Sequence, residues 1–171
     1  MPLKLTRLIA PISALAVVAC TQGTPPSGDD AASGAVNCKG TDSALNATGA
    51  AATNRARVAA GLPPVRANSL LAQVAAGHAC DMARRGQMSH QGSSTSGPGQ
   101  RVKARGYDTR ITAENIAAGP FDTARVLTEW QNSPGHRANI LIPQVKDFGI
   151  GRAIGADGRT QYWAAVYAAE K

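Results

Sequence analysis

The sequence predicts an α+β domain in which helices cover both sides of an antiparallel sheet. Helical periodicities occupy residues 44–60 and 69–85. Segments with a period of two close the chain at residues 148–154 and 160–168, joined by the hairpin signal Asp157–Gly158. Apolar residues occupy odd and even positions of the last segment, so helices must cover both faces of the sheet.

The first helix is alanine-rich and is expected over residues 44–60. Thr41 or Asp42 is expected to cap its N-terminus, since short polar side chains accept hydrogen bonds from the first free amides. Gly61, followed by the pair Pro63–Pro64, ends it because proline cannot continue a helix.

The second helix is expected over residues 69–85, beginning at Asn68 or Ser69 and ending before Gly86. His78 lies on its apolar face. We interpret His78 as a buried structural histidine whose ring is hydrogen-bonded, because a lone histidine among core positions seldom binds a ligand.

Shorter elements follow the second helix. Gly, Ser and Pro residues make 92–99 a loop, and a short helix is expected over 100–105. A short strand is expected at 108–113. Asp122 caps a third long helix that runs to Gln131, and one or two further helical turns are expected over 136–142.

Residues 1–20 have the composition of a secretory signal, in which Lys4 and Arg7 precede an apolar stretch. This stretch is too short for a stable transmembrane anchor. Its end, Val17–Cys20, resembles a bacterial lipobox, which predicts that Cys20 is lipidated and becomes the mature N-terminus. The alternative is an ordinary signal peptide with an incidental cysteine. Lipidation would anchor the protein to a membrane of the bacterial cell envelope.

Residues 21–37 are rich in small and polar residues and are expected to form a flexible linker. Residues 38–171 have the length of one domain. The net charge is +7, and it falls by two when Lys4 and Arg7 are removed. The basic residues form no run interleaved with aromatic residues, so we expect no nucleic-acid partner, and we expect a monomer.

Two cysteines, Cys38 and Cys80, remain once Cys20 is assigned. An even pair in an exported protein predicts a disulfide. The alternative, a catalytic thiol at Cys80, is disfavoured because only Arg84 lies close enough in sequence to lower its pKa.

The strongest functional signal is the segment 133–141, where His136 follows a Pro–Gly turn and precedes an apolar run. Glu114 begins a second polar group, Glu114–Ala117, and His90 lies in an isolated Ser–His pair. The chain has only three histidines. Two of them together with a glutamate suggest one assembled polar site.

Short motifs, each weak alone, form an ordered set along the chain. In order they are Asn54–Arg55, Gly61–Pro63, Ala79–Ala83, Ser89–His90, Glu114–Ala117, Trp130–Leu141, Phe148–Gly151 and Tyr162–Trp163. This set resembles the CAP superfamily of cysteine-rich secretory, antigen 5 and pathogenesis-related 1 proteins, and is most similar to its bacterial SCP-like branch. The resemblance covers residues 38–168.

The resemblance implies an α-β-α sandwich with a cleft that carries two histidines and two acids. His90 and His136 match the two histidines, and Glu114 matches the first acid. Glu129 is the only carboxylate near the position of the second acid, and its place on a helix leaves it either in the cleft or facing water.

Such a cleft suggests three functions. The first is a binding module for a metal ion, for a lipid, sterol or peptide, or for both, with His90, His136, Glu114 and Glu129 as candidate ligands for Zn²⁺. Alternatively, the protein is a hydrolase in which Glu114 acts on zinc-bound water. The third function is a structural polar cluster. We favour binding over catalysis.

A hydrolase without zinc would need a nucleophile beside the histidines. The candidates are Ser133 and Ser89, activated by His90 or His136 with Glu114 as the orienting acid. Neither serine lies in a strained nucleophile-elbow motif, which is one reason that we favour binding.

Overall fold

The computed structural model describes residues 34–171. The predicted signal segment 1–20, with Cys20, and most of the predicted linker 21–37 lie outside this range. The helices are α1 (Ser43–Ala59), α2 (Ser69–Arg85), α3 (Pro98–Ala104), α4 (Thr123–Asn132) and α5 (Pro134–Ile140). The strands are β1 (Asn37–Gly40), β2 (Arg66–Ala67), β3 (Thr109–Gly119), β4 (Asp147–Ile154) and β5 (Gln161–Glu170).

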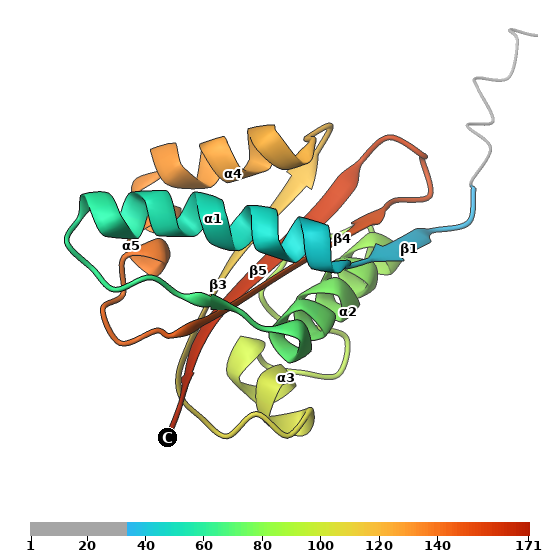
Figure 1. The fold of residues 1–171 in the computed structure, drawn as a ribbon. Helices are drawn as coiled ribbons and strands as arrows, with labels where there is room; N and C mark the ends of the chain where they lie inside the picture. The colour runs from blue at the N-terminus through green and yellow to red at the C-terminus, as the bar shows by residue number, and fades with distance from the viewer. Residues whose placement is uncertain (1–33) are drawn as a thin grey trace, which may run out of the picture. The chain divides into compact units, whose positions relative to one another are not determined.

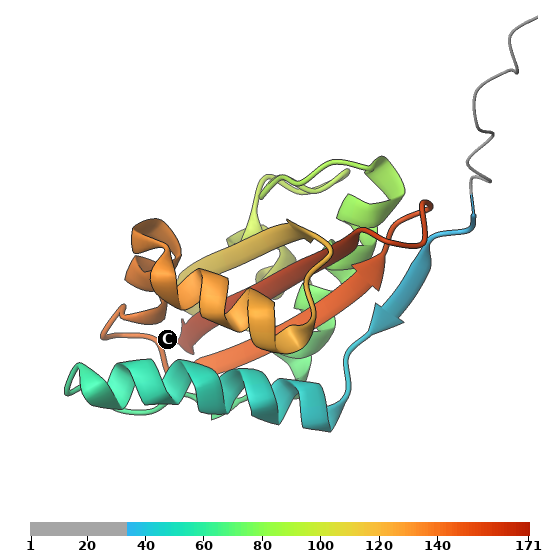
Figure 2. The same ribbon diagram turned by 90° about the horizontal axis from the view of Figure 1, so that it is seen from above.

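The strands form one sheet in the order β1-β4-β5-β3, and its neighbours along this path are antiparallel. The two-residue β2 adds a short parallel pairing to β4. Helices α2 and α3 lie on one side of the sheet, and α1 and α4 lie on the other (Figures 1 and 2). The predicted sandwich of helices around an antiparallel sheet is confirmed.

Alternation along β5 divides the core into two clusters, as the sequence pattern predicts. Trp163, Ala165 and Tyr167 pack with buried residues of α1 and α4. Tyr162 and Val166, from the even positions, pack with α2. Every one of these side chains is at most 7% exposed, so both faces of the sheet contribute to the core.

Glycines bring α2 unusually close to β4. A Cβ atom on Gly149 would overlap the backbone of Ala72, and one on Gly151 would overlap Ala76. Because neither position has room for a side chain, the helix backbone lies directly on the strand. This close approach fixes the position of α2, which carries His78.

The predicted helix ends are confirmed for the two long helices. Asp42 caps α1 by accepting a hydrogen bond from the amide of Leu45 at 2.7 Å. Asn68 caps α2 in the same way, through the amide of Leu71 at 3.1 Å. Gly86 ends α2 in the left-handed conformation, with φ of 60°.

The structure corrects the expected strand at 108–113. Strand β3 runs to Gly119, because its whole length pairs with β5. The polar pair Glu114–Asn115 interrupts the apolar pattern, so the sequence signal ends before the strand does. Strands β1 and β2 were not expected from the sequence. Both pair with β4, and neither segment has a strand pattern of its own.

The predicted disulfide is confirmed. Cys38 on β1 and Cys80 on α2 are bonded, with their Cα atoms 5.1 Å apart and a sequence separation of 42. In the chain-entropy description, closing a loop of this size stabilises the fold by about 4 kcal/mol. No helix in residues 34–171 combines the length and apolar character that crossing a membrane requires.

Candidate functional site

Glu114 is the centre of the site. Its side chain is only 1% exposed, and it shares the sheet face of Ile116, which packs on the α2 cluster. Oε1 lies 2.9 Å from Nδ1 of His90, and Oε2 accepts a hydrogen bond from Nη2 of Arg101 at 2.6 Å. A buried carboxylate is therefore compensated by one full cation and oriented toward one imidazole.

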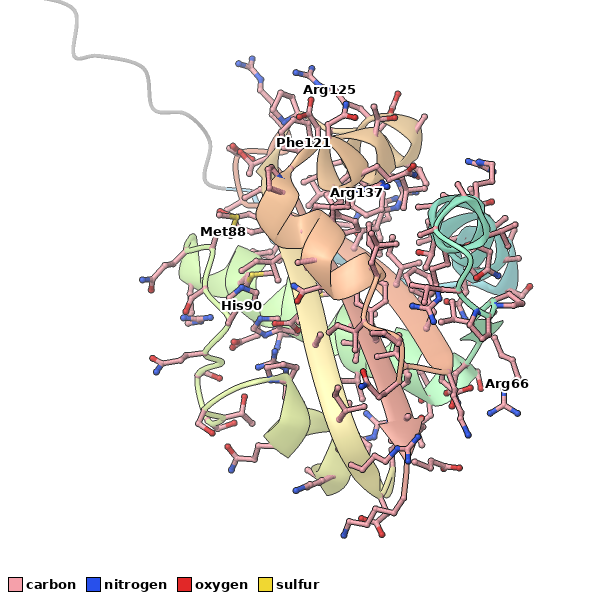
Figure 3. The ribbon with its side chains drawn as sticks, turned by 90° about the vertical axis from the view of Figure 1, so that its left-hand side faces the viewer. Arg66, Met88, His90, Phe121, Arg125 and Arg137 are labelled. Atoms are coloured by element: carbon pink, nitrogen blue, oxygen red, sulfur yellow. A yellow bond between two sulfur atoms is a disulfide. The ribbon has the colours of Figure 1, made fainter. Side chains whose placement is uncertain are left out.

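Arg101 ties three segments together. It comes from α3, and besides Glu114 it donates from Nη1 to the carbonyl oxygen of His90 at 2.9 Å and to Oγ1 of Thr95 at 3.2 Å. The loop that bears His90 is thereby held against the strand. Figure 3 shows His90 beside β3. Its side chain is 55% exposed, so its ring is accessible.

His78 lies beneath this pair on α2 and is buried, as the sequence predicts. Its Nε2 lies 2.9 Å from the carbonyl oxygen of Ser89 and 3.7 Å from Oε1 of Glu114. Burial lowers the pKa of His78, against the opposing charge of Glu114. Because a carbonyl only accepts, the neutral ring carries its proton on Nε2, and Nδ1 is a free acceptor.

His136 approaches from the other side of β3. It lies in the first turn of α5, which begins two residues before the helical turns expected over 136–142, and it is half-buried. Its carbonyl oxygen accepts a hydrogen bond from Nδ2 of Asn115 at 3.1 Å. Burial, and secondarily His90, lower the pKa of His136. Its Nδ1 is buried and has no hydrogen-bond partner among residues 34–171.

Asn139 fastens α5 to the strand that carries Glu114. Its Nδ2 donates to the carbonyl oxygen of Glu114 at 3.1 Å and to Oδ1 of Asn115 at 2.9 Å. These bonds fix the distance between α5 and β3. His136 is consequently held at the edge of β3, on a helix whose position these hydrogen bonds fix.

The fourth predicted residue, Glu129, belongs to α4. Its side chain is 55% exposed, and Oε1 lies 3.7 Å from Nε of Arg125 one helical turn away. Of the two positions that the sequence allowed, the structure has Glu129 facing water. His90, Glu114 and His136 are therefore brought together around β3, and Glu129 is not one of this group.

The donor set of this site does not fit a resident zinc ion. Both oxygens of Glu114 are engaged, Oε1 with Nδ1 of His90 and Oε2 with the guanidinium of Arg101. Among residues 34–171, no group of three or more His, Cys, Asp or Glu side chains has the arrangement of a metal site. No reaction step is therefore assigned to a metal, and titration with Zn²⁺ is the test of the zinc hypothesis that the sequence raised.

Neither candidate serine has its hydroxyl hydrogen-bonded to a histidine ring. Oγ of Ser89 accepts a hydrogen bond from the amide of Gln91 at 3.1 Å. Ser133 precedes α5 and makes no side-chain capping bond. Within residues 34–171, no hydroxyl is hydrogen-bonded to the ring of His90 or His136.

Sequence reasoning missed Arg101 and Asn139. Asn139 had a signal, since it follows His136 by three residues and so lies on the same side of a helix. Arg101 had none. Its contact with Glu114 depends on how α3 docks against β3, which no local pattern encodes.

A helix-sheet-helix sandwich whose edge strand carries a glutamate between two histidines defines the class of CAP-domain proteins. The model of the cysteine-rich secretory protein family matches residues 50–167. The chain belongs to this family.

Two curated relatives from Bacillus subtilis (strain 168) match over 99 residues. The uncharacterized protein YkwD is 33% identical, and the match covers 58% of this chain and 38% of that protein. The uncharacterized membrane protein YlbC is 31% identical, over 58% of this chain and 29% of that protein. The chain thus spans well under half the length of either relative.

Solved structures share the fold. An extracellular protein containing an SCP domain from Bacillus anthracis is 28% identical with a TM-score of 0.65, covering 75% of this chain and 41% of that one. An outer surface protein from Borrelia burgdorferi is 20% identical with a TM-score of 0.67, over 77% and 97% of the two chains. The second likeness concerns the fold alone.

Proposed function

We propose that this chain is an exported, lipid-anchored envelope protein whose CAP domain binds a ligand between His90 and His136. The leader-like segment 1–20 and the lipobox-like cysteine at position 20 support export and anchoring. A relative of known structure is an extracellular protein. The ligand is a lipid, sterol or peptide whose polar group meets the two imidazoles.

The observation that carries the binding proposal is a pair of ring nitrogens near one strand edge that have no partner within residues 34–171, one on an exposed ring and one buried. Nδ1 of His90 is held by Glu114, which leaves Nε2 of a half-exposed ring for a ligand. Nδ1 of His136 is buried and has no partner in residues 34–171. A buried polar nitrogen without a partner is costly, and a ligand's hydroxyl or carboxyl group would remove that cost.

Calorimetric titration of the full chain with oleate and, separately, with trialanine tests the proposal. Each probe offers a carboxylate, on a lipid chain in one case and on a peptide in the other. We expect one of them to bind, with affinity about tenfold lower in His90→Ala and in His136→Ala, as the loss of one hydrogen bond implies. Glu129→Ala is the control and should bind as the original chain does.

Binding that survives both histidine substitutions would place the ligand elsewhere and overturn the proposal. Failure of both probes to bind a folded chain would overturn the lipid and peptide ligand classes. It would leave the structural role of the polar cluster as the better account of these residues.

Hydrolysis is the second candidate, favoured by one contact. The 2.9 Å hydrogen bond between Glu114 and Nδ1 of His90 is the arrangement of a general base with its orienting carboxylate. The test is turnover of p-nitrophenyl butyrate by the full chain and by Glu114→Gln. A hydrolase would lose turnover in the variant while its circular dichroism stayed unchanged, and no turnover in the original chain counts against it.

A further inference from the structure

Helix α5, which carries His136, has little apolar surface to hold it in place. Of its seven residues, only Ile140 is buried. A helix of this length is marginal on its own in water, so its position depends on hydrogen bonds from the rest of the protein. Those bonds come from two directions, from β3 and from α1, whose C-terminal end lies beside α5 (Figure 1).

The bonds from β3 hold α5 against the strand. Asn115 donates to the carbonyl oxygen of His136, and Asn139 donates to the carbonyl oxygen of Glu114, both at 3.1 Å. These bonds set how far α5 lies from β3. They join the helix to a single strand, so they do not by themselves fix its rotation about that line of contact.

The bonds from α1 come from one buried arginine. Arg57 lies in the last turn of α1 and is 0% exposed. Its Nη1 donates to the carbonyl oxygens of Ile140 and Ile142, each at 2.8 Å. Its Nε donates to the carbonyl oxygen of Pro63 at 2.9 Å, and Nη2 donates to that of Val145 at 3.3 Å. One guanidinium therefore joins α1, the end of α5 and the segment that leads into β4.

Two of these acceptors lie where a helix lacks partners of its own. Ile140 is the last residue of α5, and Ile142 follows two residues later. The last carbonyl groups of a helix have no partner within the helix. They also carry the negative end of its dipole, which a cation stabilises. Arg57 thus caps the C-terminus of α5 from a different helix.

The charge of Arg57 is compensated by carbonyl groups alone. Within residues 34–171 it forms no ion pair, and four of its five N–H donors are used by the bonds to carbonyl oxygens. A buried cation is costly unless its donors are satisfied. Because the planar guanidinium directs its donors along fixed directions, it sets the orientation of α5 as well as its distance from α1.

We propose that Arg57 is a positioning residue of the cleft between His90 and His136. It acts through α5. With Arg57 bonded to the end of the helix and Asn115 bonded to its first turn, α5 cannot rotate, and the ring of His136 keeps its Nδ1 buried. The functional meaning of this inference rests on the proposed binding cleft, whereas the geometry involves no ligand.

The ring of His136 reports its own placement. Its centroid lies 6.4 Å from that of the Trp130 ring, so the ring current of Trp130 makes the Hε1 chemical shift of His136 depend on position. The chain has three histidines. Proton–carbon NMR spectra of the full chain therefore contain three ring Cε1–Hε1 signals, which single His→Gln substitutions assign. At about pH 8, well above the usual histidine pKa, the shifts report placement rather than protonation.

Arg57→Gln should move the His136 signal by more than its linewidth and leave the His78 signal in place. Affinity for whichever of oleate and trialanine binds should fall about tenfold, as expected when a hydrogen bond to His136 is lost. Arg57→Lys gathers its donors at one nitrogen and cannot reach all four carbonyl groups, so it should move the His136 signal by less. Leu71→Ala is the control, because it opens a cavity in the cluster on the α2 side and should lower the urea midpoint without moving this signal.

An unmoved His136 signal in folded Arg57→Gln would overturn the proposal. An equal movement in Leu71→Ala would do the same, since Arg57 would then contribute to stability alone. If Arg57→Gln does not fold, Arg57→Lys decides between the same two outcomes. Failure of both oleate and trialanine to bind would overturn the proposed ligand classes and leave the NMR result unaffected, so the two proposals fail separately.

Discussion

Arg101 and Glu114 form the buried ion pair on which the site depends, with Nη2 and Oε2 2.6 Å apart and side chains 10% and 1% exposed. Replacing Arg101 with Gln removes the only full cation in contact with that carboxylate among the described residues. We expect the free energy of unfolding to fall by about 3 kcal/mol, because one buried charge is left without its partner. Urea denaturation measures this.

Arg105→Gln is the matched control, since it removes an exposed arginine just beyond the same helix. The double variant Arg101→Gln/Glu114→Gln should be more stable than the sum of the single losses predicts, because the uncompensated charge is gone. Additive losses in this cycle would show that the pair is not coupled and would contradict its central role.

Zinc should not bind stoichiometrically to the full chain. Glu114 would have to leave Arg101, and the described residues offer no third ligand in position. Titration calorimetry with Zn²⁺ is the measurement, alongside His90→Ala and His136→Ala. Tight one-to-one binding that both variants lose would show that the side chains rearrange around a metal, and would restore the zinc hypothesis.

Stability should depend on pH through the buried histidines. Burial is the main cause that lowers the pKa of both His78 and His136 in the folded state. Below about pH 6.5, the usual histidine value, the unfolded chain therefore binds protons first. The free energy of unfolding is level above that pH and falls below it, by up to about 1.4 kcal/mol per pH unit for each group.

Urea midpoints at pH 7.5, 6.5 and 5.5 measure this dependence. His78→Gln and His136→Gln should each reduce the slope between the two lower values, and the double variant should reduce it further. If neither substitution changes the slope, groups other than His78 and His136 cause the pH dependence.

Two glycines near the middle of their elements should respond in opposite ways to the same substitution. Gly77→Ala should raise the free energy of unfolding by about 0.5–1 kcal/mol, because alanine favours the helix and its methyl group meets no described atom within 4 Å. Gly151→Ala should lower it by about 1–3 kcal/mol, because the methyl group overlaps the backbone of Ala76. Thermal unfolding of the two variants is the measurement.

Local patterns predicted most of the fold. Helix caps such as Asp42 and Asn68, the stop at Gly86 and the hairpin at Asp157–Gly158 involve neighbours in sequence, so their signals are local. The far end of β3 was missed because its pairing partner, β5, comes some fifty residues later. Strand pairing of this kind is decided by tertiary contact rather than by propensity.

The residues of the candidate site could be predicted from the sequence, but the chemistry of the site could not. Resemblance to the family selected His90, Glu114 and His136, and the structure brings them together at one strand. The position of Glu129 and the contact of Arg101 with Glu114 depend on helix orientation and docking. The metal hypothesis followed from residue types, and the neighbouring guanidinium that weighs against it was visible only in three dimensions.

Membrane attachment is a prediction that rests on Cys20 alone. If this cysteine is lipidated, Cys20→Ser should move the protein from the membrane fraction to the soluble fraction, because each buried methylene of an acyl chain contributes about 0.8 kcal/mol to anchoring. Fractionation followed by immunoblotting measures the distribution. Cys38→Ser, which breaks the disulfide instead, is the matched cysteine control and should stay with the membrane. Membrane association that is unchanged in Cys20→Ser would contradict lipidation at this residue.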